Sequence, residues 1–122
     1  FTFGAHATTF GGGAIASAVA KKVVEICLRD KLTNRATNLG NHLKKSLENL
    51  KSSKPNKIKE IRSLGLMVGI DLGYDATEVW KKLLEKGFIT NLCHKTVLRL
   101  LPPLIIKRDD LDNFVQALNA CL

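Results

Sequence analysis

The 122-residue sequence has few of the residues that mark disulfide-rich, metal-binding or membrane proteins. Its three cysteines are widely spaced and form no C-x-x-C pair, which argues against a disulfide scaffold or a zinc site and favours a reducing compartment. The three histidines show no metal-ligand spacing. No apolar run reaches the ~18 residues of a membrane-spanning helix. We therefore expect no metal, no membrane partner and a cytoplasmic location.

The sequence also lacks the signals of a natural N-terminus. It begins Phe1-Thr2-Phe3-Gly4, without an initiator methionine, a basic leader or the apolar stretch of a signal peptide. We therefore expect these residues to belong to a longer protein. Apolar residues nevertheless make up 45% of the chain, which is enough for a folded core.

Aromatic residues are scarce, at 6% of the chain, and residues 29–62 contain none. The same segment holds ten basic and three acidic residues, so it carries seven of the eight net positive charges. One interpretation is a stand-alone basic module that binds RNA or another polyanion. Nucleic-acid modules usually combine basic residues with aromatics, however. We favour a solvated helix face followed by a lysine-rich loop, and we expect no nucleic-acid partner.

The spacing of apolar residues predicts an α+β fold. Leucines recur every three or four residues from Leu32 to Leu50, which indicates a helix with one buried stripe. The segment Leu66–Leu72 is almost continuously apolar, as in a central strand, and Gly69 within it permits a bulge or a close backbone contact. We expect helices over about 12–28, 31–51, 75–87 and 109–122, and strands over about 58–63, 66–72, 88–91 and 97–101. This order predicts a two-layer domain, with a small, mainly antiparallel sheet and helices packed on one face.

Side chains near the expected helix ends suggest how those helices begin and end. Asp75 is expected to open the third helix with Glu78 as its capping carboxylate, and Gly87 to end it. Asp109 is expected to cap the last helix. His42 falls on the polar side of the second helix, where we expect it to be solvated.

Two threonines followed by three glycines precede the first expected helix. Helix N-termini expose unpaired N–H groups, and the hydroxyls of Thr8 and Thr9 add further donors, so the segment suits a phosphate. The same pattern also fits an ordinary helix cap. No Walker motif or G-x-G-x-x-G is present.

Arg99 lies in the middle of an apolar strand, Val97–Leu101. Side chains alternate along a strand, so Arg99 shares a face with Val97 and Leu101. An arginine half-buried among aliphatic residues needs an anionic partner, and its planar fork suits a carboxylate. The alternatives are a structural salt bridge or an edge residue that reaches solvent.

Three segments resemble one family, the class III pyridoxal-phosphate-dependent aminotransferases. His6-Ala7-Thr8-Thr9-Phe10-Gly11-Gly12 is similar to the family's H-G-[ST]-T-[FY]-G-G segment, and Ser63–Ile70 is similar to its G-L-M-x-G strand pair. The segment Val97–Leu104 resembles the substrate-binding segment near the family's C-terminus. Its R-L-L-P-P-L form is most like the acetylornithine aminotransferase branch. Gly13-Ala14 departs from the Asn-Pro that the family usually has there.

The resemblance implies a fold and a set of roles. Residues 1–122 would form the C-terminal small domain of a fold-type I aminotransferase, with 1–11 as a cofactor-phosphate segment leading into the first helix. Thr9 matches the threonine that binds the phosphate of pyridoxal 5'-phosphate from the opposite subunit of a homodimer, and Thr8 matches its neighbour. Arg99 matches the arginine that binds the substrate α-carboxylate.

The resemblance also implies a reaction. The whole enzyme would transfer an amino group between N-acetylornithine and 2-oxoglutarate, in arginine biosynthesis. The Schiff-base lysine and the aspartate that partners the cofactor nitrogen lie upstream of Thr8 in the family. We therefore expect no catalytic residue and no turnover in these 122 residues alone. Ornithine, succinylornithine and 4-aminobutyrate aminotransferases are alternatives, and so is a regulatory domain that binds a carboxylate through Arg99 alone.

Overall fold

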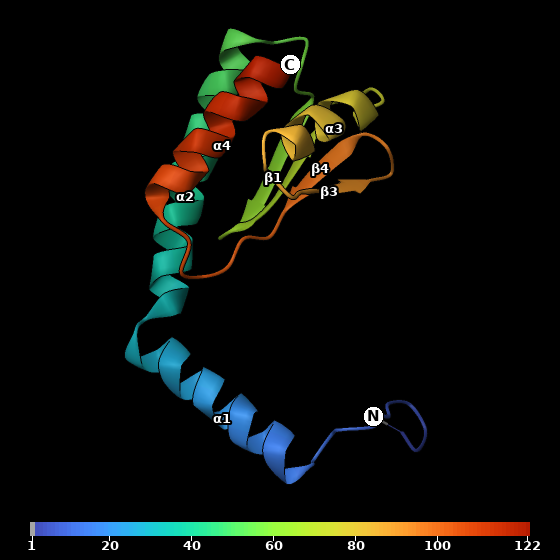
Figure 1. The fold of residues 1–122 in the computed structure, drawn as a ribbon, viewed down its shortest axis with the longest axis vertical. Coiled ribbons are helices and arrows are strands. Elements are labelled where there is room, and N and C mark those ends of the chain that lie inside the picture. The colour runs from blue at the N-terminus through green and yellow to red at the C-terminus, as the bar shows by residue number, and fades with distance from the viewer. Residues whose placement is uncertain (1) are drawn as a thin grey trace. The chain divides into compact units, whose positions relative to one another are not determined.

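A computed structural model describes residues 2–122, so only Phe1 of the expected 1–11 segment lies outside the described residues. The chain divides into two compact units, one up to Thr33 and one from Asn34 to Leu122, and each is described by itself. The elements in chain order are α1 (Ala14–Arg29), α2 (Leu32–Ser53), β1 (Glu60–Leu64), β2 (Met67–Asp71), α3 (Thr77–Glu85), β3 (Asn91–Cys93), β4 (Val97–Leu100) and α4 (Arg108–Cys121) (Figure 1).

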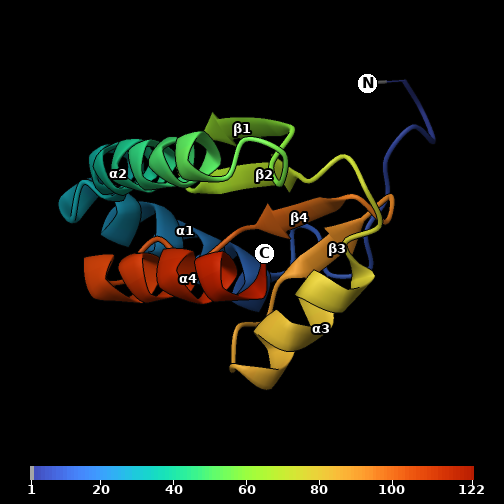
Figure 2. The same cartoon turned by 90° about the horizontal axis from the view of Figure 1, so that it is seen from above.

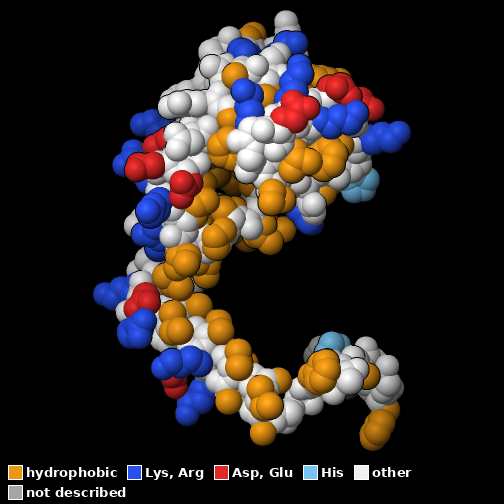
Figure 3. Space-filling model, in the orientation of Figure 1, with side chains coloured by type: hydrophobic (Ala, Val, Ile, Leu, Met, Phe, Trp, Pro, Cys, Tyr) orange, Lys and Arg blue, Asp and Glu red, His pale blue; other side chains and the backbone are white. Residues whose placement is uncertain are grey.

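The first unit consists of a turn-rich segment and α1, which confirms the first predicted helix. None of the residues of α1 is buried. Apolar side chains gather along this helix in Figure 3, and the large ones among them are Ile15, Val19, Val23, Val24 and Leu28.

The second unit contains a four-stranded sheet in the order β1-β2-β4-β3, and every neighbouring pair is antiparallel. This confirms the predicted α+β class. The pairing of β2 with β1 and β4 is continuous, so Gly69 forms no bulge. β1 and β2 are joined through Gly65, whose φ of 54° is the positive value that a tight hairpin favours at this position.

The strand predicted over residues 88–91 is wrong, since β3 begins only at Asn91. The backbone N–H of Phe88 donates to the carbonyl of Leu83 at 2.9 Å, and the indole of Trp80 donates to the carbonyl of Thr90 at 2.9 Å. Both bonds tie this segment to the end of α3 instead of to a neighbouring strand. Gly87, at φ 85°, provides the left-handed residue that ends α3 as predicted.

The core lies between one face of the sheet and three helices, α2, α3 and α4 (Figure 2). Val68, Ile70, Leu98 and Leu100 supply the sheet side of this core. The helix side includes fully buried Leu43, Leu47, Leu83 and Leu118. This arrangement confirms the expected two-layer packing and the leucine stripe of α2.

A close contact between two glycines joins α2 to the β1–β2 turn. A Cβ at Gly40, on α2, would lie only 2.2 Å from the carbonyl oxygen of Gly65. The helix can therefore approach the turn only because residue 40 has no side chain. This contact could not be predicted from the sequence, because a glycine inside a helical pattern has several explanations.

The helix starts differ in detail from those expected. Ala76 is the N-cap of α3, and Asp75 caps from one residue earlier by accepting the N–H of Thr77 at 2.9 Å. Glu78 pairs with Lys81 instead of capping. Lys107 is the N-cap of α4, so Asp109 lies in the first turn of the helix and the prediction that it caps is wrong.

Candidate functional site

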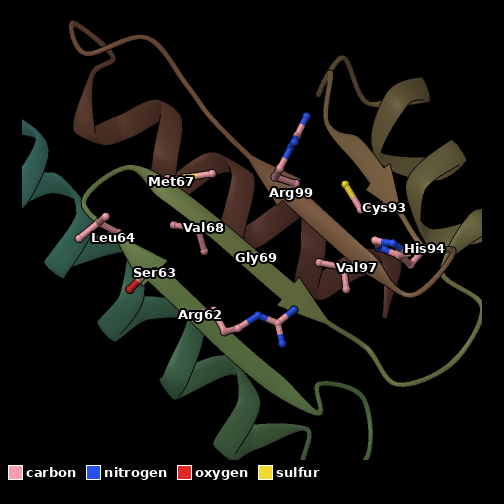
Figure 4. A pocket seen from close by; sticks show the side chains of 10 residues that line it. All are labelled: Arg62, Ser63, Leu64, Met67, Val68, Gly69, Cys93, His94, Val97 and Arg99. Atoms are coloured by element: carbon pink, nitrogen blue, oxygen red, sulfur yellow. The ribbon is translucent and has the colours of Figure 1, made fainter. Parts of the chain in front are cut away.

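The second face of the sheet is the candidate site, and no helix of the second unit packs on it. Because side chains alternate along each strand, this open face carries the residues that the core does not use. They are Glu60, Arg62, Leu64, Met67, Gly69, Asp71, Asn91, Cys93, Val97 and Arg99. The face holds a shallow hollow of about 440 Å³, whose lining Figure 4 shows.

Four of these residues form one row across all four strands. Arg62 on β1 pairs with Gly69 on β2, Gly69 pairs with Arg99 on β4, and Arg99 pairs with Asn91 on β3. The row therefore presents two arginines and one amide with a glycine between the arginines. Sequence reasoning singled out Arg99 and missed the other members, since the row exists only once the strand register is known.

Arg99 is exposed, which corrects the expectation that it is half-buried among aliphatic residues. Its aliphatic neighbours Leu98 and Leu100 point to the core, and Val97 is the half-buried residue on its own face. Among residues 2–122, no carboxylate lies within ion-pair distance of Arg99. The structure therefore does not support the alternative of a structural salt bridge, and the guanidinium of Arg99 is available to a ligand.

The other charged groups on the open face are already engaged. Arg62 forms an ion pair with Glu60, and about half of each side chain is exposed. Asp71 accepts the N–H of Gly73 at 2.9 Å, and this hydrogen bond holds the pKa of the Asp71 carboxyl below its usual range. Of the two arginines on this face, Arg62 and Arg99, only Arg99 therefore has an unpaired guanidinium among the described residues.

The loop that follows Arg99 is tied to α2 by a second arginine that sequence reasoning did not single out. The guanidinium of Arg35 donates to the carbonyl oxygens of Leu104 at 3.2 Å and Ile106 at 2.5 Å. The N–H of Ile106 in turn donates to the carbonyl of Pro103 at 3.0 Å. The segment Leu104–Ile106 is thus held to α2 by one fork-shaped cation.

Thr8 and Thr9 lie in the first unit, in turns that precede α1, and both are exposed. The carbonyl of Thr8 accepts the N–H of Gly11 at 3.4 Å, and Gly12 adopts a φ of 75°. Gly13, the N-cap of α1, provides no side-chain cap. Thr8 and Thr9 therefore do not cap the helix themselves, and their hydroxyls and the first N–H groups of α1 fit the donor set that a phosphate needs.

His42 is not simply solvated, as was expected. Its Nε2 lies 2.5 Å from Oδ1 of Asp112, so it links α2 to α4.

Cys93 and His94 lie at the end of β3, where His94 and Lys95 adopt positive φ in the turn to β4. No group of three possible metal ligands occurs among the described residues. None of the helices in that part of the chain is long and apolar enough to span a membrane.

Several cations of the basic segment 29–62 are used within the chain. Arg29 pairs with Asp30, and Lys54 donates to the carbonyl of Asn119 at 2.7 Å. Arg35 holds the loop after β4 and Arg62 pairs with Glu60. The segment therefore has structural uses for its charge, in agreement with the helix-and-loop interpretation.

Fold and site together define an α+β domain whose open sheet face presents an unpaired arginine. A profile of the family described as "Aminotransferase class-III" matches residues 1–122. The chain belongs to this family of pyridoxal-phosphate-dependent enzymes.

Individual relatives agree with this assignment. The chain is 41% identical, over 118 residues, to the acetylornithine aminotransferase of Methanocaldococcus jannaschii, and 39% identical, over 112 residues, to the ornithine aminotransferase of Bacillus subtilis. These matches cover 97% and 92% of the chain but only 29% and 27% of the two relatives. The chain thus spans less than a third of their length.

Solved structures show the same fold. The ornithine aminotransferase of Toxoplasma gondii and the acetylornithine aminotransferase of Elizabethkingia anophelis each match with a TM-score of 0.84 and 30% identity. Each match covers 99% of this chain, and 30% and 31% of the respective structures. Another structure of the Toxoplasma enzyme contains pyridoxal phosphate at partial occupancy in its active site.

Proposed function

We propose that residues 1–122 form the C-terminal small domain of an aminotransferase that transfers an amino group between N-acetylornithine and 2-oxoglutarate. In this proposal Arg99 binds the α-carboxylate of the amino acid or 2-oxo acid. Thr8 and Thr9 bind the phosphate of pyridoxal 5'-phosphate, with Thr9 acting across the interface of a homodimer. The enzyme works in the cytoplasm, in arginine biosynthesis.

The observation that carries this proposal is the free guanidinium of Arg99 on an open, folded surface. An arginine fork binds a carboxylate through two parallel charge-assisted hydrogen bonds. Arg99 stands on a strand whose next residue, Leu100, is packed in the core, so the backbone beneath the guanidinium is fixed. Arg35 fixes the loop that follows. The α-carboxylate is thereby held in one orientation relative to the domain.

The chain also supplies donors for the cofactor phosphate. The exposed hydroxyls of Thr8 and Thr9 precede a helix start without a side-chain cap, and both features suit an anion. When bound, pyridoxal phosphate supplies the electron sink on which amino transfer depends. The described residues contribute binding and orientation to that chemistry.

The test uses the protein encoded by the whole reading frame that contains these residues. With pyridoxal phosphate, N-acetylornithine and 2-oxoglutarate, we expect formation of glutamate. Arg99→Gln should lower kcat/KM by about tenfold or more, mainly through KM, because a charge-assisted pair to the substrate is lost. Lys86→Gln, which removes an exposed cation outside the open face, is the matched control and should change nothing. Equal kcat/KM for the two variants would contradict the role of Arg99.

A second candidate, ornithine as amino donor, is favoured by the identity of 39% to the Bacillus subtilis ornithine aminotransferase. The same assay separates the two donors. A higher kcat/KM for N-acetylornithine supports the proposed function, whereas a higher kcat/KM for ornithine assigns the protein to the second.

A further inference from the structure

Asn91 is the polar side chain directly beside Arg99 on the open face of the sheet. Along β4, the side chains that share this face with Arg99 are those of Val97 and Leu101, and both are apolar. Across the strands, Arg99 lies opposite Gly69 on β2 and Asn91 on β3. Because glycine has no side chain, the amide of Asn91 is the cross-strand group that Arg99 meets.

The side chain of Arg99 extends toward the side of the sheet on which Asn91 lies. In Figure 4 it points away from Arg62, on the side where Cys93 and β3 lie. β3 is an edge strand in the order β1-β2-β4-β3, so Asn91 ends the row on that side. Residues directly opposite one another in an antiparallel pair have Cβ atoms about 4.5–5.5 Å apart. The short amide side chain therefore lies beside the stem of the longer arginine.

The backbone of Asn91 is held on both sides, whereas its amide group is free. The indole of Trp80 donates to the carbonyl of Thr90, the residue before Asn91, at 2.9 Å. Leu92, the residue after it, pairs with buried Leu98 on β4. The side chain of Asn91 is exposed and forms no hydrogen bond to another of residues 2–122. A fixed strand thus presents an available amide to its neighbour on β4.

We propose that Asn91 is a positioning residue that acts through Arg99 when substrate binds. Its amide oxygen accepts one guanidinium N–H and leaves the remaining donors, with their full charge, to the α-carboxylate. An arginine side chain has many rotamers, so a neighbour that restricts them without neutralising the charge favours binding. The inference rests on the proposed function, which assigns Arg99 to the α-carboxylate, and it adds a residue that the sequence motifs did not identify.

The neutrality of the amide matters, because a carboxylate at position 91 would compete with the substrate. Opposite charges directly across two strands attract one another, so an acid there would pair with Arg99. The acids on this face lie outside the row of Arg99: Glu60 pairs with Arg62, and one oxygen of Asp71 accepts a backbone N–H. Asn91 therefore leaves the guanidinium of Arg99 unpaired until a ligand arrives.

The test uses the protein encoded by the whole reading frame, with pyridoxal phosphate, N-acetylornithine and 2-oxoglutarate. Asn91→Asp should raise KM for both substrates by about fivefold at low salt, because the introduced carboxylate pairs with Arg99. This increase, relative to the unaltered enzyme, should shrink in high salt, which screens an exposed ion pair. Asn91→Ala should raise both KM values by about twofold at any salt concentration, since it removes one hydrogen bond. Neither variant should change kcat.

Asn56→Asp is the matched control, since it makes the same charge change at an exposed position in the loop before β1. It should leave both KM values unchanged. In an Arg99→Gln background, Asn91→Asp should have no further effect, because the group through which it acts is gone. A merely structural role of Asn91 would persist in that background. Circular dichroism reports whether each variant is folded.

The outcomes separate this inference from the proposed function. If Arg99→Gln lowers kcat/KM while both Asn91 variants keep the original KM values, the inference is wrong and the role of Arg99 stands. The inference is also wrong if Asn91→Asp acts equally in both backgrounds, or if Asn56→Asp raises KM as much. If Arg99→Gln changes nothing, the proposed role of Arg99 is wrong, and the positioning role of Asn91 is wrong with it.

Discussion

Along β4, successive residues meet two different surroundings. Leu98 and Leu100 are buried against three helices, whereas Arg99 between them is exposed on the face that no helix of the second unit covers. The residues of β4 on the covered face are aliphatic and carry no polar or charged group that could bind a ligand. The open face carries charges that contribute little to packing. One short strand therefore separates the residues that maintain the fold from those that we assign to binding.

Truncation of adjacent residues of β4 should affect stability very differently on the two faces. Leu98→Ala should lower the free energy of unfolding by about 2–5 kcal/mol, because it leaves a cavity beneath the sheet. Arg99→Ala should change it by no more than about 0.5 kcal/mol, since the side chain is exposed and unpaired. Chemical denaturation followed by circular dichroism measures both. Equal destabilisation by the two variants would show that the faces are not distinct.

The covered side can also be tested without removing a side chain. Gly40→Ala should destabilise the chain by about 1–3 kcal/mol, because the added Cβ would clash with the backbone of Gly65 and force α2 away from the sheet. Asn41→Ala, at an exposed position of the same helix, is the control and should leave the midpoint of unfolding nearly unchanged. Tolerance of both substitutions would mean that α2 and the β1–β2 turn can separate.

The covered face was largely predictable from sequence, since it follows from periodicity. The leucine spacing of α2 and the apolar run of β2 identified most of their buried residues, although Met67 of β2 is exposed on the open face. The error at residues 88–91 arose because a hydrogen bond from Trp80 and a Schellman-type helix end hold that segment, and neither has a periodic signature.

The open face was predictable only in part. Arg99 stood out because it interrupts an apolar strand. Arg62 did not, because it is one of many cations in residues 29–62 and only the register of β1 with β2 places it in the same row. Arg35 donates to residues about 70 positions away in the chain, a separation that no local pattern reveals.

A smaller effect on stability is expected from substitution of Arg35, which holds the loop after β4. Arg35→Gln should destabilise the chain by about 1 kcal/mol, since charge-assisted bonds to two carbonyls are lost at an exposed site. It should also speed hydrogen exchange at the N–H of Ile106, which closes the neighbouring turn. Arg108→Gln, which removes only a 3.9 Å contact with Asp112, is the control. Unchanged exchange at Ile106 in Arg35→Gln would contradict the role of Arg35.

The smallest expected effect on stability concerns Asp75, whose carboxylate accepts the N–H of Thr77 at the start of α3. Hydrogen bonds from the hydroxyl and the N–H of Thr77 hold the pKa of the Asp75 carboxyl below its usual range. A depressed pKa in the folded state means that this stabilisation is present above the unfolded pKa of about 4 and is lost as the pH falls through the folded value. Asp75→Ala should therefore destabilise the chain slightly at neutral pH and flatten the decline of stability in acid. Thermal unfolding between neutral pH and about pH 3 measures this decline, and an unchanged acid limb in the variant would show that another carboxyl is responsible.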